Sequence, residues 1–321
     1  MQRASHEDMC FMRDVTTRFD CKEWNGFNTQ RAREAGMTVE AKAKVMYLPL
    51  INKTPTSPTT IMTAIKTGLR LVNEARQTVL VFTVDQQLYK VSIDLLFYEP
   101  SLFRNVVPIC GGMHWLMNAI HSIGVLLSPA IKSILASTFG SVVRMLQGKK
   151  YPQNFRAIRM IAEEMLHGIL LKNSNIVSAE QLITYLENQS KISNTVKLWT
   201  DCLIKPVFIM LAFLRAAREK DLALHYASAK RMLPYFAAFR GHNYARYGTF
   251  YVHHLESLPT EMIKKLKNDC SLRVSSGIFN AIHTDQFIET TYMRLGHGPG
   301  GATGLTINER QMTVWALSFA T

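Results

Sequence analysis

The chain has 321 residues, of which 47% are hydrophobic and 19% are charged, and this composition excludes an intrinsically disordered protein. Lysine and arginine number 37 against 24 acidic residues, and the formal net charge of +13 favours a polyanionic partner such as nucleic acid. The alternative is a basic protein without such a partner. The five cysteines form no Cys-x-x-Cys pair, which argues against a disulfide framework or a zinc finger.

The N-terminal residues do not resemble a signal peptide, and the cysteine pattern is typical of reduced thiols. We therefore expect a nuclear or cytoplasmic protein that is not secreted. The longest apolar run, Val207–Leu214, is too short to cross a bilayer, so no membrane segment and no membrane partner are predicted.

The N-terminal half predicts alternating strands and helices. Residues 44–52 form a short apolar segment that is compatible with a strand. Ser57 and Pro58 are residue types that favour the N-cap and the first position of a helix, so a helix is predicted after them. Residues 79–84 are apolar or β-branched and predict a buried strand that ends at Asp85.

Residues 86–97 have apolar side chains near helical spacing, and residues 106–112 predict a second strand closed by two glycines, with another helix after it. Because strands and helices alternate here, we expect an α/β core with a partly parallel sheet. From Ser128 to about Leu258 the patterns are helical and predict an all-α block. Residues 283–295 predict a short helix that carries acidic residues.

Asp85 is the first candidate for chemistry, because a carboxylate at the end of a strand can face a cleft and bind a divalent metal. The alternative is that Asp85 caps the helix that starts at Gln86, since aspartate is a favoured N-cap.

His114 is the second candidate. It follows Gly111 and Gly112 at the predicted start of a helix, and Asn118 and His121 lie on the same helix face. A strand, a glycine turn and then a histidine are compatible with the edge of an active site. The alternative is a core helix whose polar groups are all hydrogen-bonded.

Asp285 and Glu289 are the third candidates. They are four residues apart, so they share a helix face and repel each other unless a metal or a basic partner is present. The alternative is a solvated helix face. The glycine-rich residues 296–301 follow a helix rather than a strand, so they do not predict a nucleotide-binding loop.

Residues 148–159 and 235–254 interleave aromatic side chains with arginine and histidine, as surfaces do that stack bases and neutralise phosphates. The alternative is that these aromatic rings pack between helices. The candidate phosphate contacts are Lys149, Lys150, Arg156, Arg159, Arg246 and Arg294.

Several sequence blocks occur together and in order: MYLPLI, TIMTAIKTG, VDQQLYK, VPICGGMHWLMNAIHSIG, GKKYPQNFRAIRM, HNYARYG, DQFIETTYMRLGHGPGGATG and WALS. This order resembles a group of uncharacterised, mobile-element-derived proteins of invertebrate genomes. The layout is similar to that of RNase H-like transposases, whose sheet is interrupted by a long helical insertion.

The resemblance implies an α/β fold, an RNase H-like mixed sheet core interrupted by a large all-α insertion. Residues 1–127 would form the N-terminal part of the core, 128–270 the insertion and 271–321 the C-terminal part. No strand that ends in a suitable acid precedes residue 44. We therefore expect either a fragment or a remnant that lacks one catalytic carboxylate.

The resemblance also implies a DNA-binding protein that, if active, is a divalent-metal-dependent nuclease or transposase and cuts or joins strands. Asp85 and Glu289 would bind Mg²⁺ or Mn²⁺, Asp285 would be the substitute acid, and His114 would border the site.

Two other functions stay open. The first is a catalytically inactive, domesticated module that binds DNA or protein. The second is a small-molecule α/β enzyme with a closed apolar pocket near His114. The sequence also leaves open whether the chain forms a homo-oligomer.

Overall fold

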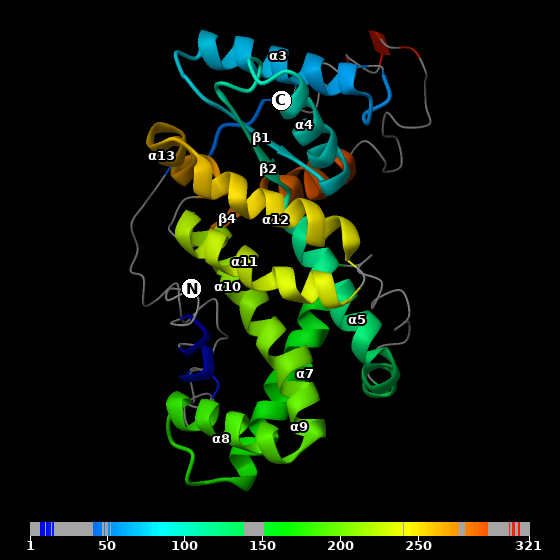
Figure 1. Ribbon diagram of the computed structural model, residues 1–321, viewed down its shortest axis with the longest axis vertical. Coiled ribbons are helices and arrows are strands. Elements are labelled where there is room, and N and C mark those ends of the chain that lie inside the picture. The colour runs from blue at the N-terminus through cyan, green and yellow to red at the C-terminus, as the bar shows by residue number, and fades with distance from the viewer. Residues whose placement is uncertain are drawn as a thin grey trace. The chain divides into compact units, whose positions relative to one another are not determined.

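In the computed structural model the described residues are 7–9, 11–13, 15, 41–46, 48, 51, 53–137, 151–239, 241–275, 280–294, 308, 310, 311 and 314. They are 74% helical (Figure 1). The chain divides into two compact units. Unit 1 comprises Met1–Thr38 and Trp115–His253, and unit 2 comprises Val39–His114 and His254–Thr321.

The prediction of an RNase H-like mixed sheet, which followed from the resemblance, is wrong. The strands that the structure describes form two separate sheets of two strands each. In one sheet β1 (Leu80–Val84) pairs in parallel with β2 (Val106–Cys110). In the other, β3 (Leu272–Arg273) pairs in antiparallel with β4 (Ala281–Ile282). The described residues of 44–52 have no regular secondary structure and add no strand.

The physical reason is that helices, not a wide sheet, bury the apolar surface in the described parts of the chain. In unit 1, a buried cluster joins Ala212 and Ala216 of α10 (Lys205–Glu219) to Leu224 and Ala227 of α11 (Leu222–Ala238), so helix packs directly on helix.

In unit 2 the local predictions from the helix after Ser57 to the strand that starts at residue 106 are confirmed. β1, α4 (Gln86–Tyr98) and β2 form a parallel βαβ unit, with Leu80 opposite Val106. α3 (Pro58–Glu74) begins at the expected proline. The core of this unit joins α3, α4 and β2, and its buried residues are Ile61, Ile65, Leu95, Phe103 and Val106.

Helix α3 ends with an arginine in the left-handed conformation. The N–H of Arg76 donates to the carbonyl of Asn73, and the N–H of Gln77 donates to the carbonyl of Val72, at 2.9 and 2.8 Å. This is a Schellman motif, in which glycine is the usual residue at the position of Arg76, whose φ is 54°. Lys220 occupies the same conformation, with φ 59°, at the end of α10.

The C-terminal part of unit 2 contains α13 (Thr260–Asp269), α14 (Thr284–Ile288) and the π-helical turn η2 (Glu289–Met293). The helix predicted at 283–295 is therefore confirmed over residues 284–294, and His283 occupies the position before it. Lys265 Nζ of α13 donates to Gln77 Oε1 at 3.0 Å and so ties α13 to the end of α3.

The described residues of unit 1 contain no strand. The unit contains the larger parts of α5 (Gly112–Ala136) and α12 (His242–Ser257), together with α7 (Tyr151–Lys172), α8 (Ala179–Ile192), α9 (Asn194–Trp199), the π-helical turn η1 (Thr200–Ile204), α10 and α11. The described residues 7–9, 11–13 and 15 are also helical.

Helix α5 is long and apolar enough to cross a bilayer by length and composition alone. Core helices meet the same criterion. Leu116, Ile120 and Ile131 of this helix are fully buried against protein.

The aromatic residues between 235 and 254 belong mainly to a core. The ring of Trp115 packs against those of Phe213, Phe236, Tyr244 and Tyr251, with centroids 5.3 to 6.4 Å apart. This arrangement favours helix packing, the alternative open at the sequence level, over a surface of exposed rings that stack bases.

A buried ion pair attaches the N-terminal segment to α10. Glu7 and Arg215 have side chains that are 2% and 4% exposed and form a salt bridge. Arg215 Nε also donates to Glu219 Oε1 at 2.9 Å. Next to this pair, Arg231 of α11 binds Asp8 at 2.5 Å.

Replacing Arg215 with methionine leaves the buried carboxylate of Glu7 without its guanidinium partner. We expect Arg215→Met to lower the free energy of unfolding by about 3–5 kcal/mol, and we expect Glu7→Gln in the same chain to restore part of it. Urea denaturation measures both changes. The control is Lys205→Met, which breaks an exposed pair on the same helix and is expected to cost less than about 1 kcal/mol. Equal losses in the two variants would contradict a structural role for the buried pair.

Candidate functional site

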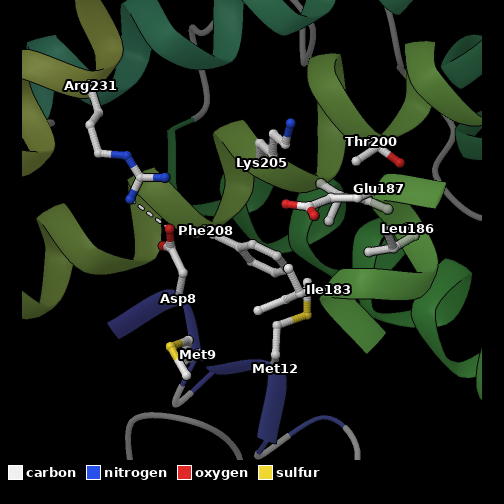
Figure 2. Close-up of a pocket in the computed structure, with 11 residues that line it drawn as sticks. Asp8, Met9, Met12, Ile183, Leu186, Glu187, Thr200, Lys205, Phe208 and Arg231 are labelled. Carbon is white, nitrogen blue, oxygen red and sulfur yellow. Dashed lines mark hydrogen bonds and ion pairs between the residues drawn. The ribbon is translucent and has the colours of Figure 1, made fainter. Parts of the chain in front are cut away.

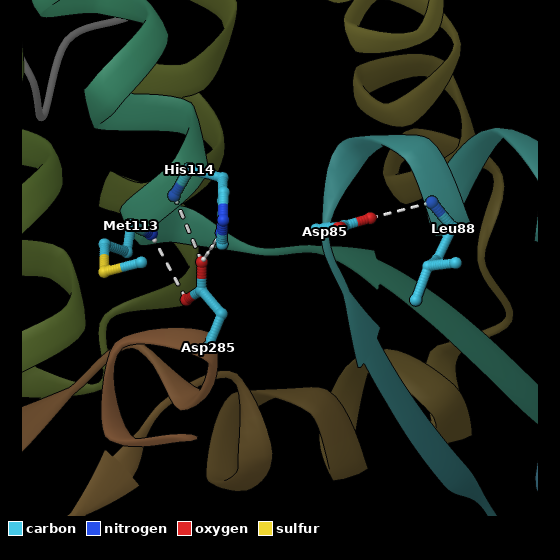
Figure 3. Close-up of polar contacts among 5 residues, drawn as sticks. All are labelled: Asp85, Leu88, Met113, His114 and Asp285. Atoms are coloured by element: carbon cyan, nitrogen blue, oxygen red, sulfur yellow. Dashed lines mark hydrogen bonds and ion pairs between the residues drawn. The ribbon is translucent and has the colours of Figure 1, made fainter. Parts of the chain in front are cut away.

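Asp85 follows β1 directly and is the N-cap of α4. Its backbone is extended, with φ −66° and ψ 173°, and Oδ1 accepts a hydrogen bond from the N–H of Leu88 at 2.8 Å (Figure 3). A helix needs such acceptors because its first N–H groups have no carbonyl four residues before them. The N-cap interpretation of Asp85 is therefore confirmed.

Asp285, in the first turn of α14, has a carboxylate that binds the start of α5. The residue is only 6% exposed. Oδ1 accepts from the N–H of Met113 at 3.2 Å, and Oδ2 accepts from the N–H of His114 at 3.1 Å (Figure 3). Asp285 thus satisfies two N–H groups at the positive end of a helix that begins 173 residues earlier, at Gly112.

The same carboxylate also holds the His114 ring. His114 Nδ1 lies 3.0 Å from Asp285 Oδ2, and 27% of the histidine side chain stays exposed while 8% of the aspartate side chain does. A hydrogen bond at Nδ1 fixes the orientation of an imidazole and leaves Nε2 for another partner. The two residues therefore form an Asp–His dyad.

Electrostatics in this dyad favour a protonated imidazole. The hydrogen bond that His114 donates to Asp285 raises the pKa of His114 above its usual value, against the effect of burial, and the negative charges of Asp85 and Glu289 act in the same direction. Burial alone would raise the pKa of Asp285. The hydrogen bonds from His114 and Met113 and the charge of His283 outweigh it and hold that pKa below its usual value.

The two glycines before His114 allow the chain segments to approach this closely. A Cβ atom on Gly111 would overlap the Asp285 carboxylate, and a Cβ on Gly112 would overlap the ring of His283. His283 is 2% exposed, so protein atoms surround its ring. The Gly-Gly pair and the His283–Asp285 segment therefore interlock. We call this arrangement the Asp285 clasp.

Glu289 is the first residue of η2 and is exposed. The described residues contain no group of three or more His, Cys, Asp or Glu side chains arranged to hold a metal ion. Both oxygens of Asp285 and one of Asp85 already accept hydrogen bonds from N–H groups. This donor set does not fit a two-metal centre, and a role for Asp85 and Glu289 in binding Mg²⁺ or Mn²⁺ stays a prediction.

The candidate phosphate contacts differ in exposure. Arg156 on α7, Arg246 on α12 and Arg294 after η2 are exposed. The guanidinium of Arg246 lies 5.4 Å from the centre of the Tyr247 ring. Arg159 is half-buried and pairs with Glu163 at 3.3 Å. Lys149 and Lys150 lie outside the described residues.

Sequence reasoning missed His283, whose only signal is its place two residues before Asp285. It also missed the contact between Gln77 and Lys265, which are 188 residues apart and carry no local pattern that links them.

A family model described as a domain of unknown function (DUF8702) matches residues 23–184 and 178–321 of the chain. No curated protein and no solved structure shows a significant match.

Gly112→Ala tests the clasp sterically. The added methyl group would overlap the buried ring of His283, so we expect the free energy of unfolding to fall by about 1–3 kcal/mol. The control is Gly168→Ala in α7, where a Cβ meets open space. Because alanine favours helix, this second change should raise stability by up to about 1 kcal/mol. Thermal or urea unfolding compares the two, and similar effects in both variants would contradict the clasp.

The dyad also predicts how stability depends on pH. Because the folded state raises the pKa of His114, its contribution is complete below the usual histidine pKa and is lost as pH rises through the folded value. The difference in unfolding free energy between the wild type and His114→Gln should therefore shrink as the pH rises above the usual histidine pKa of about 6.5. His283 is present in both proteins. A difference that is constant or grows with pH would contradict the assignment.

Proposed function

We propose that the chain, which belongs to the DUF8702 family, binds the phosphate backbone of duplex DNA through its surface charge. The observation that carries the proposal is the formal net charge of +13, combined with exposed basic side chains that have no acidic partner among the described residues. Such side chains displace counterions from DNA, which gives salt-dependent affinity.

In unit 2, three such side chains lie just after α3 and on α13, two elements that the hydrogen bond between Lys265 and Gln77 joins. Arg76 adjoins Gln77, which Lys265 of α13 binds, and Lys264 and Lys267 are neighbours of Lys265 on that helix. Lys265 is neutralised by Asp269 at 2.8 Å. Arg76, Lys264 and Lys267 are exposed, and within the described part of the chain they form no salt bridge. We call these three residues the α3–α13 basic group.

In unit 1, Arg156 and Arg246 are exposed and, among the residues that the structure describes, have no acidic partner. Arg294 has the same properties in unit 2. The positions of the two units relative to each other do not enter the proposal, because each presents its own basic side chains.

The binding should depend little on base sequence. Trp115, Phe236 and Tyr251 are buried in the core and cannot stack on bases. Contacts to phosphates position a protein on DNA but carry no direct sequence information. Strand cleavage is not part of the proposal, since the carboxylates of Asp85 and Asp285 accept hydrogen bonds from helix N–H groups.

Fluorescence anisotropy with a labelled duplex over a KCl series tests the proposal. We expect log K to fall linearly with log[KCl]. We expect Arg76→Gly, Lys264→Gln and Lys267→Gln together to reduce the slope by about 0.9 for each phosphate that the variant no longer neutralises. Affinity that is independent of salt, or a triple variant with the wild-type slope, would contradict it. Single-stranded DNA and duplex RNA of the same length show whether the duplex form matters.

Arg76→Gly and Lys220→Gly form a matched pair for this experiment. Each removes one positive charge and places glycine at a positive φ, of 54° and 59° respectively, where glycine is less strained. Neither change should lower thermal stability. Only Arg76→Gly should weaken DNA binding, because Lys220 lies outside the α3–α13 basic group.

A further inference from the structure

An apolar groove of about 330 Å³ lies in unit 1, between α7, α8, α9 and η1. Its buried residues, which form its floor, are Leu186, Thr200 and Ile204. Most other lining residues are half-buried, and Gly168 and Lys172 are exposed. Because a groove of this kind is open to solvent, it suits a chain segment that lies in it better than a small molecule that must be enclosed.

Helix α7 supplies one wall of the groove. Met165, Gly168, Ile169 and Lys172 line it and are spaced by three and four residues or fewer, so they share one face of the helix. This face spans about two turns, or roughly 10 Å. A partner helix that lies in a groove makes its contacts over a similar length, through side chains spaced by three and four residues.

Gly168 leaves the middle of this wall without a side chain. Glycine inside a helix is less favourable than alanine. A Cβ atom at this position would meet no neighbouring atom within 4 Å, so packing within the chain does not require glycine here. The missing side chain does allow the backbone of a partner to approach α7 closely.

Apolar surface extends beyond the groove. Ile192 lies seven residues after Tyr185 and therefore on the same face of α8, and it is 80% exposed. Leu171, next to Lys172 at the end of α7, is 73% exposed. Exposed apolar side chains that adjoin an apolar groove are typical of a site that binds another protein.

The polar side chains of the three walls are mainly hydrogen-bond donors. Lys172 of α7, Tyr185 of α8 and Trp199 of α9 line the groove, and in the described part of the chain none of these side chains forms a salt bridge or a hydrogen bond. An ammonium and an indole N–H can only donate, and a phenol hydroxyl can donate. Tryptophan and tyrosine are also enriched among the residues that dominate binding energy at interfaces.

No acidic residue is among the described residues that line the groove. Glu187 of α8 lines a neighbouring cavity of about 320 Å³, which shares Leu186 and Thr200 with the groove (Figure 2). Thr200 Oγ1 is buried and has no hydrogen-bond partner among the residues that the structure describes, so it belongs to the floor and is not an accessible donor. The charge that lines the groove comes from Lys172 and is positive.

We propose that this groove is a docking site for an acidic amphipathic helix of a partner protein. The helix lays its apolar side chains onto Tyr185 and Trp199, crosses α7 closely at Gly168 and directs a carboxylate towards Lys172. The net charge of +13 attracts an acidic partner over a longer range. The groove lies in the other unit from the α3–α13 basic group, so the proposal is independent of DNA binding.

Fluorescence anisotropy of the full chain with three labelled peptides of about 14 residues, or roughly four helical turns, tests this proposal. The first peptide has leucines spaced by three and four residues and glutamates on its other face. The second has lysine in place of each glutamate, and the third has serine in place of each leucine. We expect the first to bind at least tenfold more tightly than the other two. Equal binding of either control peptide, or no binding of the first, would overturn the proposal.

Gly168→Leu distinguishes binding from folding. Leucine favours helix and its side chain has open space here, so the melting temperature should stay the same or rise. The same side chain would occupy the place where the partner helix approaches α7, so affinity for the first peptide should fall at least tenfold. Wild-type affinity in this variant would overturn the proposal.

Lys172→Gln and Lys132→Gln are a matched pair. Each removes one positive charge from an exposed lysine of unit 1, but only Lys172 lines the groove. Lys172→Gln should weaken binding of the first peptide by about three- to fivefold, the range expected for an exposed ion pair. Lys132→Gln should leave it unchanged. Equal effects would show that net charge alone attracts the peptide, and would overturn the assignment of the site.

A second copy of the chain is the alternative occupant of the groove. Sedimentation velocity over a concentration series separates the two cases. We expect Gly168→Leu to have the same oligomeric state as the wild type at every concentration. A wild-type dimer that dissociates in Gly168→Leu would overturn the proposal and assign the groove to self-association.

Discussion

The carboxylate of Asp285 is the contact on which unit 2 depends most. It satisfies two N–H groups at the start of α5 and holds the His114 ring, although it lies 171 positions further along the chain than that histidine. Because a buried carboxylate is stable only when its lone pairs have donors, these hydrogen bonds and the close approach at Gly111 and Gly112 require one another. The C-terminal segment is thereby fixed to the strand-to-helix turn after β2.

This arrangement gives a structural role to the acidic residues that the sequence analysis selected as candidates for catalysis. Asp85 and Asp285 cap helices, and both act electrostatically on His114 together with Glu289. Three carboxylates therefore act on this dyad in a protein that is basic as a whole. DNA binding, as proposed, therefore uses other surfaces, and the Asp285 clasp serves the stability of the unit.

Local features were predictable from the sequence because they depend on neighbouring residues. The strand at 80–84, the helix that begins at Pro58 and the N-cap alternative for Asp85 all follow from residue type and spacing. The number of strands in a sheet does not follow from residue type and spacing, because strand pairing is set by contacts between distant segments. A βαβ unit occurs in many folds. The RNase H-like prediction was wrong because it used a family resemblance to add further strands to this unit.

The site itself was predicted in pieces. Gly111, Gly112, His114 and Asp285 were each singled out, but no local pattern indicates that they meet. The aromatic residues at 235–254 were compatible with either a buried core or a binding surface by their spacing. The packing of Phe236 and Tyr251 around Trp115 shows that they belong mainly to a core. Thr200 had no signal at all, since an unpartnered hydroxyl is a property of the fold.

The most direct test of the Asp285 clasp is the unfolding free energy of Asp285→Asn compared with the wild type, each measured with EDTA and with excess Mg²⁺ or Mn²⁺. The asparagine is isosteric but uncharged and cannot accept on both sides, so the clasp predicts a loss of about 3 kcal/mol that is the same in both conditions. A wild type stabilised by the metal, together with a variant that is as stable as the wild type in EDTA, would contradict the clasp and favour a metal-binding role for Asp285.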